Sequence, residues 1–234
     1  MVDRFALAKM IEGSLLDPSA ARRQIVDFCE RAVELHVASV CVFPYWAADC
    51  ARVLSGSDVR LCVPTGLPFG ICAAQVKLLD AKGAISAGAN EIDFVVNMGA
   101  LKSCSLSVVE RELGEMINLS RLAGMTDNRE VAAVNMVLEA DRLTDEELGS
   151  ACKIALHSGV EFIKTSTGLM PSHPIPKEVR LIRQRVGQEI GIKVAGDVRT
   201  AAEVMELVNA GATRVGTRHM SEVVEAGKPN PKRP

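Results

Sequence analysis

Residues 144–164, TDEELGSACKIALHSGVEFIK, contain one complete helix-to-strand unit. Thr144 is followed three residues later by Glu147, which is the spacing of a capping box and marks the start of a helix. Gly159 stands where that helix must stop and turn, and the short apolar strand 161–164 follows at once. A helix that leads directly into a strand is the repeating unit of folds with a parallel sheet, so the segment predicts a fold of that kind.

The same alternation recurs along the whole chain, and eight strand–helix units can be counted. The predicted strands are Lys9–Gly13, Ser39–Phe43, Arg60–Pro64, Glu91–Val95, Val131–Leu138, Glu161–Lys164, Gly191–Ala195 and Arg214–Gly216. The predicted helices begin near Ser19, Tyr45, Ile71, Leu106, Thr144, Ile175, Thr200 and Met220.

Eight units in 234 residues predict an α/β protein with a single-domain (β/α)8 TIM barrel, a fold that takes about 250 residues. We place this domain at residues 1–226. The last residues, 227–234, are rich in proline and cations and cannot bury apolar surface, so we expect a flexible C-terminal tail. A doubly wound sheet would also alternate, but it usually has fewer units, and no Gly-x-Gly-x-x-Gly follows the first predicted strand.

Composition excludes several classes of protein. Hydrophobic residues make up 48% of the chain and charged residues 24%, which excludes intrinsic disorder. Lys plus Arg (27) nearly balance Asp plus Glu (29), and aromatic residues make up 3%, so we expect no nucleic-acid partner. The sequence shows no signal-peptide pattern and no apolar run long enough for a membrane span. Seven widely spaced cysteines suit reduced thiols, so we expect a cytoplasmic protein without membrane partners.

Lys164 is the first candidate for catalysis. It ends an apolar strand, and Thr165-Ser166-Thr167-Gly168 follows it. Active-site residues of barrel enzymes lie at the carboxyl ends of the strands. Burial disfavours the ammonium form, so we expect Lys164 to have a lowered pKa and to be a neutral, nucleophilic amine. The alternative is a lysine whose stem follows the strand while its head reaches solvent at the rim of the barrel.

Two further charged residues interrupt apolar strands. Lys193 lies in the strand after that of Lys164, and a second cation nearby favours the neutral form of the Lys164 amine. Whether the two lysines face the same way depends on strand register, and a salt-bridged structural lysine is the alternative. Asp93 lies in a strand that should be buried on both faces, where a carboxylate needs a partner. Glu91 has the same phase, so either acid can simply be solvated at the strand entrance, whereas a buried Asp93 beside two lysines can relay protons.

The turns after the seventh and eighth predicted strands suit an anion. Each leads into a helix, and the first N–H groups of a helix bind phosphate, which barrels often hold at this place. Asp197 is also suited to capping the helix that follows it. The candidate residues for binding substrate or phosphate are Thr165, Gly168, Gly196, Asp197, Arg199, Gly216 and Arg218. The four histidines lack metal-ligand spacing, so no metal is expected, and we interpret Cys41 as a small core residue.

Residues 162–168, FIKTSTG, resemble the Schiff-base lysine motif of the class I deoxyribose-phosphate aldolase family. Further matches stand in the same order at Val40–Pro44, Gly88–Asp93, Val137–Glu139, Ile192–Gly196 and Gly211–Thr217. The resemblance implies that Lys164 forms the imine, with Lys193 as the accessory lysine and Asp93 as the proton relay. It also implies a lyase that reversibly cleaves 2-deoxy-D-ribose 5-phosphate to acetaldehyde and glyceraldehyde 3-phosphate without a metal or organic cofactor.

The sequence departs from the family pattern near the expected site. The family usually has Asp-His-Thr at the end of its first strand, where this chain has Glu12-Gly13-Ser14, and Asn135 replaces a lysine of the fifth strand. Asp197 replaces the second glycine of a Gly-Gly phosphate turn, and Arg218 replaces a serine of the last phosphate turn. An aspartate repels phosphate whereas an arginine attracts it, so we expect the chemistry to follow the family more closely than the substrate does.

Two other functions remain open on the sequence. A phosphosugar isomerase or synthase barrel would share the phosphate turns, but it would not need two neighbouring lysines. A non-catalytic member of the family would bind a metabolite or a partner protein. For the aldolase we expect small aldehydes and sugar phosphates as partners, and a homo-oligomer, by default a dimer.

Overall fold

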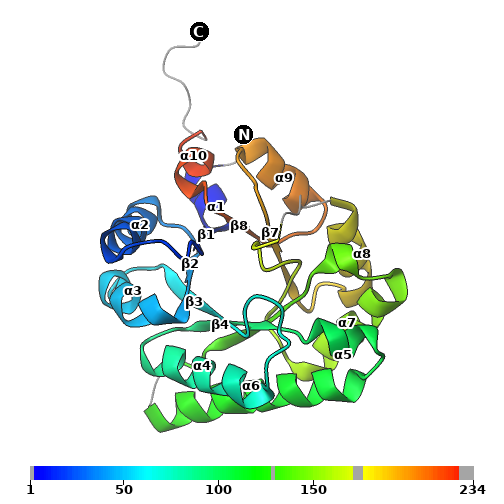
Figure 1. Cartoon of the computed structure of the whole chain (residues 1–234). Helices are drawn as coiled ribbons and strands as arrows, with labels where there is room; N and C mark the ends of the chain where they lie inside the picture. Colours follow the sequence, from blue (N-terminus) through cyan, green and yellow to red (C-terminus); the bar gives the residue numbers. More distant parts are fainter. Residues whose placement is uncertain (1–2, 128–129, 171–175, 227–234) are drawn as a thin grey trace.

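The computed structural model describes residues 3–127, 130–170 and 176–226, in which eight parallel strands close into a barrel surrounded by helices (Figure 1). The strands are β1 (Ile11–Leu15), β2 (Ser39–Val42), β3 (Arg60–Thr65), β4 (Glu91–Val95), β5 (Ala133–Val137), β6 (Phe162–Lys164), β7 (Gly191–Ala195) and β8 (Arg214–Thr217). Each strand pairs with its neighbours in sequence, and β1 also pairs with β8, which closes the sheet. The predicted TIM barrel is therefore confirmed.

Helices follow the strands and form the outer layer seen around the barrel in Figure 1. They are α1 (Arg4–Ala8), α2 (Arg22–Leu35), α3 (Ala47–Leu54), α4 (Ala74–Ser86), α5 (Met98–Lys102), α6 (Leu106–Asp127), α7 (Asp145–Ser158), α8 (Pro176–Val186), α9 (Ala201–Asn209) and α10 (Met220–Glu225), with short 3-10 helices at Pro44–Trp46 and Ala140–Arg142. Within the described residues, no helix is both long enough and apolar enough to cross a membrane.

Several predicted boundaries are wrong by a few residues. The first strand begins at Ile11, because Lys9 ends the unpredicted short helix α1 and pairs with Asp58 at 2.7 Å. Helices α2, α3 and α4 begin two or three residues later than predicted, and α3 is preceded by a 3-10 turn. The short helix α5 was not predicted either. The predicted helix start at Ile175 and the predicted tail 227–234 lie outside the described residues.

The predicted helix ends have the expected local chemistry. Thr144 accepts a hydrogen bond from the backbone N–H of Glu147 at 3.2 Å, and the Glu147 carboxylate accepts one from the N–H of Thr144 at 2.8 Å. Thr200 and Glu203 form the same capping box on α9. Gly159 ends α7 with φ +82°, a left-handed conformation that favours glycine. These local signals mark the residues at which the helices begin and end.

Successive side chains of a strand point alternately out of the barrel and into it, so they lie in two different environments. Outward residues such as Ile163 and Ile192 join the aliphatic core between the barrel and its helices. Their neighbours Lys164 and Lys193 point the other way, into the barrel, where both are buried. The aliphatic layer thus supplies most of the apolar burial, and the inside of the barrel holds charged side chains.

Candidate active site

The two predicted lysines meet inside the barrel. Lys164 ends β6 and lies in register with Lys193 of β7, and their exposed fractions are 2% and 1%. The two lysines face the same side, a question that the sequence left open, and the alternative in which the head of Lys164 reaches solvent is wrong. Both ammonium groups reach Glu12 of β1: Lys164 Nζ lies 2.9 Å from Oε1, and Lys193 Nζ lies 2.8 Å from Oε2.

Asp93 joins the same cluster from β4. Its Oδ2 accepts a hydrogen bond from Lys164 Nζ at 2.6 Å, and its Oδ1 lies 3.5 Å from Lys193 Nζ. The side-chain amide of Asn135, the neighbouring residue on β5, donates to Oδ1 at 2.8 Å. Asp93 thus contacts both lysines, and Glu12 joins the same two lysines from β1.

Glu91 precedes Asp93 by two residues on β4, so both side chains lie on the same face of the strand, and Glu91 is fully buried. Its carboxylate contacts Lys193 Nζ at 2.6 Å, Arg214 at 2.7 Å and Arg60 at 3.2 Å. The alternative in which one of the two acids is solvated at the strand entrance is wrong, because Glu91 and Asp93 are both buried and cations from three other strands contact Glu91. Lys193 therefore pairs with both Glu91 and Glu12.

The charge state of Lys164 differs from the sequence-based expectation. Burial by itself lowers the pKa of Lys164, but the carboxylates of Asp93 and Glu12 more than offset it and hold that pKa well above its usual range. The pKa of Lys193 is raised in the same way. The expected neutral amine is therefore wrong for the resting site, because that expectation counted burial and the second lysine but not the carboxylates that surround both.

The pKa values of the two acids shift in the opposite direction. Burial would raise the pKa of Glu12, yet the ammonium groups of Lys164 and Lys193 hold it well below its usual value. The pKa of Asp93 is lowered by the same two lysines despite its burial. Each ammonium group therefore has an ionised carboxylate within hydrogen-bond distance, so a proton leaving Lys164 has an acceptor at 2.6 Å.

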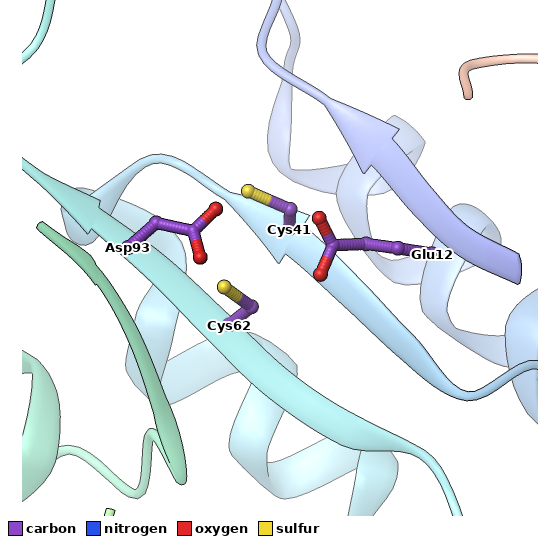
Figure 2. A group of neighbouring side chains, drawn as sticks. All are labelled: Glu12, Cys41, Cys62 and Asp93. Carbon is purple, nitrogen blue, oxygen red and sulfur yellow. The ribbon is translucent and has the colours of Figure 1, made fainter. Parts of the chain in front are cut away.

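Two thiols complete this part of the barrel. Figure 2 shows Glu12, Cys41, Cys62 and Asp93 pointing toward one another from β1 to β4, and one ligand atom of each lies within 4.8 Å of the others. Such a set of sulfur and oxygen atoms suits a soft divalent cation. However, both acids already pair with lysine ammonium groups, and burial raises the pKa of the Cys62 thiol well above its usual value. A metal ion would therefore have to displace lysine heads and thiol protons.

A cavity of about 420 Å³ opens at the carboxyl ends of the strands, beside β1, β6, β7 and β8. Of the predicted binding residues, Gly168, Gly196, Asp197, Gly216 and Arg218 line it. Thr165 and Arg199 do not: Thr165 is buried, with its hydroxyl 3.4 Å from the backbone N–H of Ala195, and Arg199 contacts Asp197. The two turns that the sequence predicts for an anion do lie at the mouth of the barrel.

Asp197 does not cap the helix that follows it. Thr200 is the N-cap of α9, and Glu203 completes the capping box. The Asp197 carboxylate instead accepts hydrogen bonds from Arg199 Nη2 at 2.9 Å and contacts His219 Nε2 at 3.1 Å. Asp197 is also one of the residues that line the cavity.

Glu12, Glu91 and Arg214 belong to the cluster but were not predicted as site residues: Glu12 was noted only as a departure from the family pattern, and Glu91 only as an acid in phase with Asp93. Glu12 interrupts an apolar strand in the same way as Asp93 does, so the test applied to Asp93 would have found it. Arg214 stands at the start of β8 and gave no such signal, because its position resembles that of a solvated strand end.

Comparisons with known proteins give one consistent result. A deoxyribose-phosphate aldolase of a Geobacillus species is 38% identical over 224 residues, covering 96% of this chain and 97% of that protein. The enzyme of the same name from Streptococcus sanguinis is 39% identical over 211 residues, covering 90% of this chain and 92% of its own. No family model matches the chain.

Solved structures agree with the sequence comparison. An aldolase named QR15 superposes with a TM-score of 0.87 at 30% identity, covering 97% of this chain and 96% of its own. A deoxyribose phosphate aldolase from Aeropyrum pernix, described as tetrameric, superposes with a TM-score of 0.86 at 26% identity over 96% of this chain and 92% of its own. With relatives this similar over nearly the full length, the chain belongs to the deoxyribose-phosphate aldolase family.

Proposed function

We propose that this protein is a Schiff-base aldolase that reversibly cleaves 2-deoxy-D-ribose 5-phosphate, or a close aldol analogue, to acetaldehyde and glyceraldehyde 3-phosphate. The observation that carries the proposal is the buried Lys164 ammonium group, 2.6 Å from Asp93 and 2.9 Å from Glu12. An amine in this position can pass its proton to a carboxylate and become the nucleophile. The names of the full-length relatives support the same chemistry.

The reaction follows from this geometry. Lys164 gives a proton to Asp93, and the free amine attacks the aldehyde carbon of the open-chain sugar. Loss of water leaves a protonated imine, which withdraws electrons as the bond between the second and third carbons breaks. The hydroxyl of the third carbon loses its proton and becomes the aldehyde of the first product. The remaining enamine takes a proton at carbon, and water then releases acetaldehyde and frees the lysine.

Asp93 and Lys193 move the protons in this scheme, with water as the carrier. Asp93 contacts both ammonium groups, so it can receive a proton from one lysine while the other keeps its charge. Glu12 and Glu91 hold Lys193 in place. The proposed steps use these side chains and water alone.

Borohydride trapping tests the proposal. After incubation with acetaldehyde and reduction, we expect one added ethyl group on the intact chain, and peptide mapping should place it on Lys164. Lys164→Met should remove the label and reduce cleavage to background. Lys102→Met, which removes a half-exposed lysine on α5, should leave both unchanged. A label on Lys193 contradicts the assignment of the imine to Lys164, and no label at all favours the isomerase or the non-catalytic alternative.

We also propose that the chain forms a homodimer. Large apolar side chains are exposed in and near α4, with Ile71 at 66% and Leu79 at 71% of their full surface. Apolar side chains that gather on one exposed face often mark a protein interface. Light scattering coupled to size exclusion measures the mass, and a monomer at micromolar concentration contradicts this proposal.

A further inference from the structure

A neutral amide lies among the charged side chains inside the barrel. Asn135 stands in the middle of β5, in register with Asp93 of β4, and has no exposed surface. Its Nδ2 donates hydrogen bonds to Asp93 Oδ1 at 2.8 Å and to Glu91 Oε2 at 3.4 Å. The amide therefore bridges the two buried acids of β4.

The carbonyl oxygen of the same amide is left without a donor. Asn135 Oδ1 is buried, and no donor from the described residues reaches it. A buried polar atom without a hydrogen bond costs free energy, and an apolar side chain of similar size, such as leucine, would avoid that cost. Packing alone therefore does not explain an asparagine at this position, whereas the hydrogen bonds that Nδ2 donates to the two acids do.

The two oxygens of Asp93 have different donors. Oδ2 accepts a hydrogen bond from the Lys164 ammonium group at 2.6 Å, and Oδ1 accepts one from the Asn135 amide at 2.8 Å, with Lys193 Nζ at 3.5 Å. An amide donates a hydrogen bond but does not release its proton at neutral pH. Oδ2 is therefore the oxygen that can take the proton of Lys164, while Oδ1 keeps its bond to Asn135 in both charge states of the acid.

The other strands supply the charges of this part of the barrel. The charged side chains that face Asp93, or its neighbour Glu91, are Glu12, Arg60, Lys164, Lys193 and Arg214. The thiols of Cys41 and Cys62 point into the same space as Asp93 (Figure 2), 4.0 Å from Lys164 Nζ and 3.8 Å from Lys193 Nζ. Asn135 adds no charge to this set. A cation in its place would lie beside both acids and weaken the hold of Asp93 on the Lys164 ammonium group.

We propose that Asn135 is a positioning residue of the proton relay: as a neutral donor to Asp93 Oδ1, it directs the Lys164 proton to Asp93 Oδ2 and keeps a further cation away from the nucleophile. In this step an N–H bond of Lys164 breaks and an O–H bond forms at Asp93 Oδ2, so the ammonium group and the carboxylate both become neutral. The inference rests on the proposed aldolase chemistry and assigns a role in it to a side chain that acts only through Asp93.

The first experiment measures kcat, KM and the pH dependence of kcat/KM for cleavage of 2-deoxy-D-ribose 5-phosphate. Asn135→Leu removes the donor without a change of charge, so kcat should fall roughly tenfold while KM and the acidic limb of the pH profile stay in place. Asn135→Lys places a cation beside the acids, so the acidic limb should move to lower pH by roughly one unit. Asn118→Lys adds the same charge on the exposed face of α6 and should change none of these values.

An unchanged kcat in Asn135→Leu, or an unmoved limb in a folded Asn135→Lys, overturns the proposal. Melting temperatures show whether the variants fold, and if Asn135→Lys does not fold, the kcat of Asn135→Leu decides. A purely structural role predicts that Asn135→Leu lowers the melting temperature and leaves kcat at the parent value, and that outcome also overturns the proposal.

A second measurement separates this inference from the aldolase proposal. Borohydride reduction with acetaldehyde labels Lys164 without any cleavage, and at low pH we expect the label to form several-fold faster in Asn135→Lys than in the parent and in Asn118→Lys, because more of the amine is neutral. A labelled parent with equal rates in all three proteins overturns the inference and leaves the aldolase chemistry standing. A parent that takes no label overturns the aldolase proposal and the inference together.

Discussion

Glu12 is the residue on which the charge of the site depends most directly. One carboxylate accepts a hydrogen bond from each lysine, through different oxygens, so it couples the protonation of Lys164 to that of Lys193. It stands where the family usually has an aspartate, and its longer side chain still reaches both ammonium groups from β1. A substitution of Glu12 therefore changes the charge around Lys164 while the lysine itself stays in place.

Glu12→Gln should make Lys164 a better nucleophile at low pH. The Glu12 charge raises the pKa of Lys164, so its removal lowers that pKa, by roughly 1–3 units for a charge this close. More neutral amine is then present at a given pH, and the acidic limb of the profile of kcat/KM against pH moves to lower pH. Lys193→Met should move the limb the other way, because it removes a cation and leaves the carboxylates. A limb that stays in place in both variants contradicts the electrostatic argument.

At the scale of elements, a buried ion pair joins α4 to α6 outside the barrel. Lys77 has no exposed surface, and its Nζ donates to Glu112 at 2.8 Å and to the carbonyl oxygen of Val95 at 3.1 Å. The same ammonium group lies 4.7 Å from the centre of the Phe94 ring. The pair thus ties two helices to β4, the strand that carries Asp93.

Lys77→Met should destabilise the fold by about 3–5 kcal/mol, because it leaves the Glu112 carboxylate buried without a partner. Adding Glu112→Leu should recover most of the loss, since two apolar side chains can pack in the same space. Lys82→Met on the exposed face of α4 is the control and should change the free energy of unfolding by less than about 0.5 kcal/mol. Urea denaturation measures all three, and a double variant as unstable as Lys77→Met contradicts the explanation.

The sequence predicted the strands and long helices because their signals are local. A capping box, a helix-ending glycine and an apolar run each lie within a few residues, as at Thr144 and Gly159. The short helices α1 and α5 were missed because five residues cannot show a helical period. The acids around the lysines were incompletely predicted for another reason: the Glu12–Lys193 contact joins residues 181 positions apart, and barrel closure alone brings them together.

At the scale of the whole molecule, the barrel has an apolar outer layer and a charged interior. Lys164 and Lys193 and the acids that hold them fill the middle of the barrel, where a protein selected for stability alone could pack aliphatic side chains. Their burial is compensated by pairing across strands that are distant in sequence. The stability of the fold and the proposed activity therefore depend on the ionisation states of the same buried side chains.

The folded state should be most stable over a broad neutral range of pH. Glu12 and Asp93 have folded pKa values below their unfolded values of about 4, so their contribution is present above that pH and is lost as the pH falls further. Lys164 and Lys193 have raised folded pKa values, so their contribution is present below about 10 and is lost as the pH rises through the folded values. Calorimetric melting temperatures should be level between about pH 5 and 9 and fall on both sides.

Surface groups also titrate, and the double variant Lys164→Met with Asp93→Asn separates the two sources. Without this interior pair the melting temperature should fall less steeply at both extremes, whereas an unchanged profile would assign the pH dependence to the surface instead.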